Sequence, residues 1–147
     1  MRLLILPVLI LLPLSALAAA KHISFDSLPT AVQRAALLEM HSGIMHGCST
    51  DTENGKTIYD VETLTSNGKR DLIFDASGNL LEAKEQIPLA TVPPAALKAL
   101  KKQAAGATIR SVASVKRGNA TTYEAAVMQH GKRRAIAVDA NGNPVHD

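Results

Sequence analysis

Two stretches of the chain place apolar residues at helical spacing. After residue 27 and again after residue 91, apolar side chains recur every three or four positions, a period typical of a helix with one face on a core. A hydroxyl residue and a proline open each stretch, so we expect Ser27 and Thr91 to cap the helices, with Pro29 and Pro93 in the first turns. The two apolar faces consist of Leu28, Ala31, Val32, Ala35 and Leu38, and of Val92, Ala95, Ala96, Ala99 and Leu100.

Behind each predicted helix, the spacing of apolar residues falls to two. Apolar and acidic side chains alternate in residues 57–63, which predicts a β-strand with one buried and one solvated face. The corresponding segment is 123–127, and both segments contain a tyrosine followed by an acidic residue. A hairpin turn and a further apolar strand follow each segment, the strands at 72–75 and at 136–139.

One five-residue motif occurs twice, 64 positions apart. Residues 75–79 read Asp-Ala-Ser-Gly-Asn, and residues 139–143 read Asp-Ala-Asn-Gly-Asn. We expect both to be hairpin turns, in which the aspartate accepts hydrogen bonds from backbone N–H groups two residues on and the glycine adopts a positive φ. A calcium loop is the alternative interpretation, but calcium needs several oxygen ligands and each motif offers one carboxylate.

Because helix starts, strands and turns recur at this spacing, the sequence predicts an α+β fold of two tandem repeats. Each repeat is expected to be αββββ, one helix followed by antiparallel strands, with the helices packed on one face of the sheet. A unit of about 60 residues buries little apolar surface by itself. We therefore expect the repeats, residues 21–87 and 88–147, to share a core and pack together as one domain, with residues 82–91 as the joint. The predicted core consists of Leu28, Val32, Ala35, Tyr59, Val61, Leu72, Phe74, Val92, Ala96, Ala99, Tyr123, Val127, Ile136 and Val138.

Residues 1–20 have the features of a secretory signal peptide. A positive charge at Arg2 precedes an apolar run, and small residues before Lys21 offer a cleavage site near residues 18–20. An uncleaved membrane anchor is the alternative, but the run is short and prolines interrupt it. We therefore expect a periplasmic or secreted protein that does not bind membranes after cleavage.

The charge is divided unevenly along the chain. Residues 21–90 hold 6 basic and 10 acidic side chains, a net charge of −4, whereas residues 91–147 hold 9 basic and 3 acidic ones, a net charge of +6. The sum, +2, is too small to indicate nucleic acid as a partner. Either the basic turn at residues 132–134 attracts an acidic partner, or the two halves neutralise each other across their interface.

The order of these motifs resembles the PepSY-like repeat, in the tandem form related to the β-lactamase inhibitor protein. The shared features are a proline-opened helix, a strand with tyrosine followed by an acidic residue, an x-Gly-Lys hairpin and a strand ending in Asp-Ala-x-Gly-Asn, and they span residues 24–146. The resemblance implies an exported bacterial protein that is not an enzyme, with helices on one side of an antiparallel sheet and the other side facing solvent or a protein partner. It also implies inhibition or regulation of peptidases or other hydrolases. The chain departs from the inhibitors in having one cysteine, Cys48, in place of disulfides, and few aromatic anchors.

A protein partner is expected to contact the solvated strand positions and the basic turn, because packing occupies the alternate strand positions. We expect neither a cofactor nor a catalytic site, since the sequence has no nucleophile elbow, no Gly-rich phosphate loop and no His-Glu-x-x-His motif. The candidate contact residues are Asp60, Glu62, Glu124, Lys132, Arg133 and Arg134.

A periplasmic metal-binding or metal-sensing protein is the alternative function. Residues 41–48 contain His41, His46 and Cys48, whose imidazole and thiolate groups suit copper(I) or zinc. On a regular strand, His46 and Cys48 point to the same face, and the corresponding stretch of the second half, residues 105–113, contains no histidine or cysteine. Against a metal site, a third firm ligand is missing, and a lone cysteine is often a small buried apolar residue or forms an intermolecular disulfide.

Overall fold

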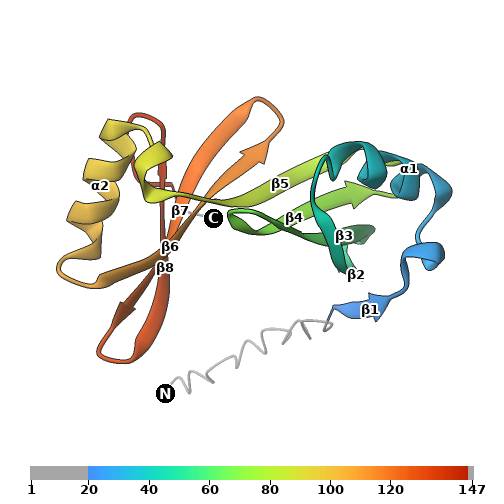
Figure 1. Ribbon diagram of the computed structural model, residues 1–147, viewed down its shortest axis with the longest axis horizontal. Helices are drawn as coiled ribbons and strands as arrows, with labels where there is room; N and C mark the ends of the chain where they lie inside the picture. Colours follow the sequence, from blue (N-terminus) through green and yellow to red (C-terminus); the bar gives the residue numbers. More distant parts are fainter. Residues whose placement is uncertain (1–19, 146–147) are drawn as a thin grey trace, which may run out of the picture.

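The protein is an open sheet of eight antiparallel strands with two helices (Figure 1). The computed structural model describes residues 20–145, so nearly all of the expected signal peptide lies outside the described residues. The strands follow one another across the sheet in chain order, and the helices lie in the connections between β1 and β2 and between β5 and β6. The elements are β1 (Lys21–Ile23), η1 (Phe25–Ser27), α1 (Thr30–Glu39), β2 (Ile44–Glu53), β3 (Lys56–Thr65), β4 (Gly68–Asp75), β5 (Leu80–Ile87), η2 (Leu89–Thr91), α2 (Pro94–Ala104), β6 (Thr108–Arg117), β7 (Ala120–Gln129) and β8 (Lys132–Asp139), where η denotes a 3-10 turn.

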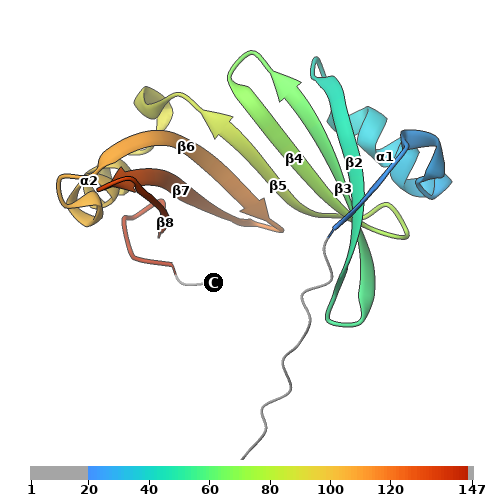
Figure 2. The same cartoon turned by 90° about the horizontal axis from the view of Figure 1, so that it is seen from below.

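Both helices pack on the same face of the sheet, as the sequence predicts. In β5, Ala83 belongs to the apolar cluster under α1, and Ile87 packs against the cluster under α2. Residues four apart in a strand point to the same side. Figure 2 shows that the sheet is arched and that the helices lie near its opposite ends. We call this side of the sheet the helix face and the other side the open face.

The buried apolar side chains other than Val115 form two clusters, one under each helix. Between them, the sheet continues through the pairing of residues 83–87 in β5 with residues 112–116 in β6. The two halves are therefore joined by strand pairing, and each half has an apolar cluster of its own. The first cluster contains Leu28, Val32, Ala36, Cys48, Val61, Leu72, Phe74 and Ala83; the second contains Val92, Ala96, Leu100, Ala104, Val112, Ala125, Val127, Ile136 and Val138.

Most of the predicted core is buried, with an offset in the helices. Ala36 and Leu100 are fully buried, whereas their predicted neighbours Ala35 and Ala99 are half-buried, because the stripe that faces the sheet is centred one residue later than expected. Leu38, on the predicted apolar face of the first helix, is 73% exposed. Tyr59 and Tyr123 are half-buried, each packed against the cluster of its own half. The confirmed positions are Leu28, Val32, Val61, Leu72, Phe74, Val92, Ala96, Val127, Ile136 and Val138.

The helices do not begin at the hydroxyl residues that the sequence suggests. Pro29 and Pro93 occupy the N-cap positions, and neither helix has a side-chain cap hydrogen bond. Ser27 and Thr91 end the short turns η1 and η2, and the Thr91 hydroxyl donates to the Pro88 carbonyl instead. The prediction of hydroxyl caps is therefore wrong, because two non-helical residues separate each hydroxyl residue from the first residue of its helix.

Several structural details recur at the spacing of the five-residue motif, although the two halves differ at their ends. A β-bulge follows Met45 in β2, and another follows Ile109 in β6. The strand β5 runs from Leu80 to Ile87, whereas at the corresponding place in the second half, within the part of the chain that the structure describes, only an isolated bridge joins Val138 to Pro144. The second half is thus a helix, three strands and a bridge. The short strand β1, which pairs with β2, was not predicted.

The repeated five-residue motifs form the predicted turns. The Asp75 carboxylate accepts hydrogen bonds from the backbone N–H groups of Ser77 (2.9 Å) and Asn79 (3.0 Å), and Asp139 makes the same two bonds to the residues two and four positions on. The Asn79 side-chain amide also donates to Asp75, and these bonds lower the pKa of the Asp75 carboxyl below its ordinary value.

The turn glycine Gly78 is expected to matter more than a turn glycine in open space. A Cβ at Gly78 (φ +81°) would lie 2.6 Å from the Ala31 carbonyl oxygen in α1, whereas a Cβ at Gly55 (φ +76°) would meet nothing within 4 Å. Gly55→Ala should cost about 1 kcal/mol, from the left-handed conformation alone. Gly78→Ala should cost about 1–3 kcal/mol more, because the added methyl also clashes with the helix. Urea unfolding measures the loss of unfolding free energy in each variant. Equal losses would show that the close contact between Gly78 and α1 does not exclude a side chain at this position.

Candidate functional site

The open face carries charged side chains from both halves of the sheet. Alternation along β3 places Asp60 and Glu62 there, because Val61 and Thr63 are buried on the helix face. Register then aligns Asp71 of β4 beside Glu62. All three carboxylate residues are half-buried. The open face of the first half is therefore acidic and partly desolvated.

Most of these charges are paired within the face. Lys69 forms ion pairs with Glu62 and with Asp71, the latter at 3.8 Å between Nζ and Oδ1. Two further pairs cross from one half to the other: Lys84 Nζ lies 2.7 Å from Glu124 Oε1, and the Arg117 and Glu82 side chains are also paired. Glu124, a predicted partner contact, thus already has a cationic neighbour inside the protein. The interpretation that the acidic first half and the basic second half neutralise each other holds at the Arg117–Glu82 pair, whereas in the Lys84–Glu124 pair the cation comes from the first half.

The Asp60 carboxylate is the least satisfied of the acidic groups on this face. Burial, followed by the neighbouring charges of Asp71 and Glu62, raises the pKa of Asp60 to about 6. One carboxylate oxygen of Asp60 and one of Asp71 are buried without a hydrogen-bond partner among the described residues. Lys69 acts in the opposite direction on the pKa of Asp60 but does not offset the burial.

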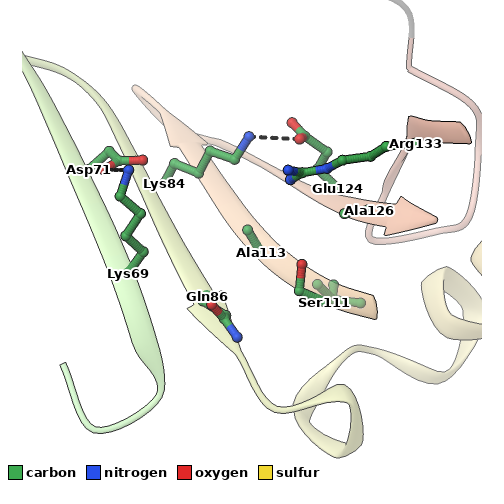
Figure 3. A pocket seen from close by; sticks show the side chains of 10 residues that line it. Lys69, Asp71, Lys84, Gln86, Ser111, Ala113, Glu124, Ala126 and Arg133 are labelled. Atoms are coloured by element: carbon green, nitrogen blue, oxygen red, sulfur yellow. Dashed lines mark hydrogen bonds and ion pairs between the residues drawn. The ribbon is translucent and has the colours of Figure 1, made fainter. Parts of the chain in front are cut away.

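A shallow pocket of about 230 Å³ lies where the two halves meet on the open face (Figure 3). The Lys84–Glu124 pair spans it, and Arg133 extends toward it from β8. Alanines form part of its second-half wall, so the pocket combines small apolar surface with charged groups, which can select complementary charges on another surface. It is lined by Lys69, Asp71, Lys84, Gln86, Ser111, Val112, Ala113, Glu124, Ala126 and Arg133.

The three residues of the predicted basic turn do not form one surface. They belong to β8, so consecutive side chains alternate between faces. Arg133 lines the open-face pocket, whereas Arg134 donates to the carbonyls of Gln103 (2.9 Å) and Ala104 (3.4 Å) in the last turn of α2. Lys132, like Arg134, is on the helix-face side of the alternation. Arg134 therefore caps the carboxyl end of α2, where a cation also interacts favourably with the helix dipole.

The first half contains the same contact between an arginine and a helix end. Arg70 donates to the carbonyl of Glu39, the last residue of α1. The two arginines, and likewise the accepting residues Glu39 and Gln103, are separated by the spacing of the five-residue motif. Comparison of the two halves of the sequence could therefore have identified Arg134 as a helix-capping residue.

The three residues of the alternative metal site do not come together as a metal-binding group within the described residues. The β-bulge after Met45 turns His46 toward the open face, where its Nε2 lies 3.4 Å from Glu62 Oε1. Cys48 pairs with Val61 and lies in the first apolar cluster, with its Sγ 3.8 Å from the Met45 sulfur. The expectation that His46 and Cys48 point to one face is wrong, because the bulge shifts the alternation between them.

His41, the third residue, is exposed just beyond the end of α1. Burial, and to a smaller extent the charge of Asp60, raises the pKa of the Cys48 thiol, which disfavours the thiolate that binds metals. Across residues 20–145, no group of three or more histidine, cysteine or acidic residues is arranged to hold a metal ion.

The sequence does not point to Lys84 and Gln86, although both line the central pocket. Residues 82–91 are expected to be a joint, but the first part of this range belongs to β5. The sequence signal is weak, because the charged Glu85 lies between Lys84 and Gln86 and interrupts the alternation of polar and apolar residues.

Comparison with known proteins identifies the fold. No family model and no curated protein sequence matches the chain. Among solved structures, a BLIP-like protein of Bacteroides fragilis is 19% identical, with a TM-score of 0.62, and the match covers 81% of this chain and 84% of that one. This chain has a BLIP-like fold.

Two other structures share the BLIP-like fold. A presumed periplasmic protein of Bacteroides eggerthii has a TM-score of 0.66 at 14% identity, with 81% of this chain and 86% of that chain covered. A DUF2874 family protein of Bacteroides ovatus has a TM-score of 0.64 at 14% identity, with 82% and 86% covered. Within the described residues, no helix is long and apolar enough to cross a membrane.

The raised pKa of Asp60 predicts that the stability of the folded protein depends on pH. The pKa lies near 6 in the folded chain and about 3.9 in the unfolded chain. The folded state therefore holds this proton more tightly, and stability should fall as the pH rises from about 4 through about 6. Asp60→Asn cannot ionise, so the variant should be more stable than the wild type at neutral pH and nearly equal to it at pH values below 4.

Urea unfolding at acidic and neutral pH tests this prediction. Glu53→Gln, at the exposed end of the β2–β3 hairpin, is the matched control and should show little pH-dependent difference from the wild type. A gain at neutral pH that is equal in both variants would contradict the assignment to Asp60.

Proposed function

We propose that this protein is an exported, non-catalytic module that binds a protein partner with the open face of its sheet. The observation that carries the proposal is the open face itself, a broad arched surface with both helices on the opposite side and a charged pocket at its centre. Charged groups on such a surface favour a partner of complementary charge and fix its register.

The proposed contacts are the open-face residues Asp60, Glu62, Glu124 and Arg133. Asp60 supports this role because it has an unpartnered buried oxygen that a donor on the partner could satisfy. Arg133 supports it because its side chain has no ion pair among residues 20–145 and lies at the pocket. Lys132 would contribute at the rim, and Arg134 only indirectly, through the end of α2.

Inhibition or regulation of a hydrolase is the form of binding that we favour, since the BLIP-like neighbour bears the name of an inhibitor-like protein. The order of sequence motifs supports membership of the PepSY-like group. The recurrence of bulges, turns and arginine–helix contacts at equivalent positions of the two halves supports two copies of one folding unit. An exported location is supported by the apolar leader sequence.

A substitution that fills the open face tests the proposal. The mature chain is immobilised to capture proteins from a periplasmic extract, and each captured protein is identified, purified and titrated. Ala126→Arg adds a long side chain at the central pocket, whereas Ala90→Arg makes the same change at an exposed position of η2, away from the open face. We expect the first variant to weaken binding about ten-fold or more, about 1.4 kcal/mol, and the second to leave it unchanged.

Thermal unfolding of both variants verifies that they remain folded. Capture of no protein, or equal weakening by Ala126→Arg and Ala90→Arg, would refute binding by the open face.

A further inference from the structure

The strand β8 forms one edge of the sheet and has backbone groups that face away from it. Val145 donates to the carbonyl of Ala137 from the side opposite β7. Because backbone groups alternate in direction along a strand, Arg133 and Ala135 present their N–H and C=O groups to the same side. Among residues 20–145, the only pairing beyond β8 is that of the segment around Pro144 with residues 137–139. The edge formed by residues 132–136 is therefore unpaired there.

The equivalent strand of the first half, β4, indicates what covers such an edge. There, β5 pairs with β4 from Arg70 to Phe74. Glu85 of β5 lies opposite Arg70, with Oε2 3.5 Å from the arginine Nε. Arg70 and Arg134 make equivalent contacts with the ends of their helices. In the first half, the covering strand thus places a carboxylate beside the arginine that caps the helix.

The unpaired part of β8 is strongly basic. Lys132, Arg133 and Arg134 are consecutive and exposed, and the first two form no hydrogen bond or ion pair with other described side chains. A hollow of about 410 Å³ beside them is lined by these three residues together with Gln129 and His130. An added strand would bring its own alternating side chains next to this positive charge on both faces of the sheet.

We infer that the free edge of β8 is a second interaction surface, which accepts an extended acidic segment of a partner protein as an additional antiparallel strand. Main-chain hydrogen bonds to Arg133 and Ala135 provide the pairing, as in other cases of strand addition. Acidic side chains lie opposite Lys132–Arg134, and aliphatic ones lie beside Ala135 and Ile136. This surface shares Arg133 with the open face but otherwise lies along the edge of β8, and it does not depend on the identity of any partner bound to the open face.

Charged residues on edge strands also prevent pairing between copies of a protein. In an antiparallel β8–β8 pair, the basic side chains of both copies would come together, so a second copy is a poor occupant. An acidic segment would be attracted to the same basic side chains, as Glu85 is to Arg70 in the first half. Binding of an acidic peptide distinguishes an edge that only repels copies from one that accepts an acidic strand.

The test uses a peptide built on β5. It has the sequence of residues 80–87 with Lys84→Thr and Gln86→Glu, which removes its basic residue and adds an acidic one opposite the basic end of β8. Titration into the isotope-labelled mature protein should give saturable amide shifts at Arg133 and Ala135, and slower hydrogen exchange at both. The same peptide with methylated backbone nitrogens keeps every charge but loses its donors, and should bind about ten-fold more weakly or worse.

Two protein variants locate the site. Ala135→Pro removes an outward N–H without breaking the bonds to β7, and Arg133→Glu reverses a charge on the same edge. In both variants the peptide should no longer shift the remaining amide signals of residues 132–136. Asp60→Asn, which alters a proposed open-face contact on β3, away from β8, should leave peptide binding unchanged, so failure here is distinguishable from failure of the proposed open-face function. The inference is overturned if no shift appears at millimolar peptide, if the methylated peptide binds equally well, or if the shifts map elsewhere.

Discussion

The pairing of β5 with β6 is the constraint on which the rest of the structure depends. Each helix packs on an apolar cluster of its own half, so the hydrophobic effect stabilises the halves separately. The ladder between residues 83–87 and 112–116 turns two small sheets into one continuous surface. The Lys84–Glu124 pair spans this junction, but partly exposed ion pairs contribute about 0–1 kcal/mol. Backbone hydrogen bonding therefore sets the relative position of the halves, and with it the shape of the open face.

Features that depend on local spacing could be predicted from the sequence. The turns at Asp75 and Asp139 follow from side-chain acceptors and a positive-φ glycine within the same short motif, and the strands follow from alternation. The strand β5 was missed in part because charged residues occur on both of its faces: Lys84 points to the open face, while Glu85 pairs with Arg70 on the helix face. A strand whose polar residues are paired on both sides does not show the pattern of a half-buried strand.

The candidate site could be predicted only as far as alternation holds. Asp60 and Glu62 were assigned to the solvated face from the period of β3. The division of Arg133 and Arg134 between opposite faces follows from the same rule once residues 132–134 are recognised as strand and not turn. The separation of His46 from Cys48 depends on a bulge that has no clear local signal, and the pairing of Lys84 with Glu124 joins residues 40 positions apart.

The distribution of stability over the two faces explains how the open face can carry unfavourable charges. The fully buried side chains on which the fold depends, among them Leu72, Leu100 and Phe74, lie in the two clusters under the helices. Asp60 lies on the opposite face, where its burial beside Asp71 opposes folding at neutral pH. Neither cluster needs a carboxylate at that position for its packing. An ionised, partly desolvated group without a full set of partners gains most from a donor supplied by another molecule. The loss of stability caused by Asp60 therefore lies on the face that we propose for binding, where a partner could offset it.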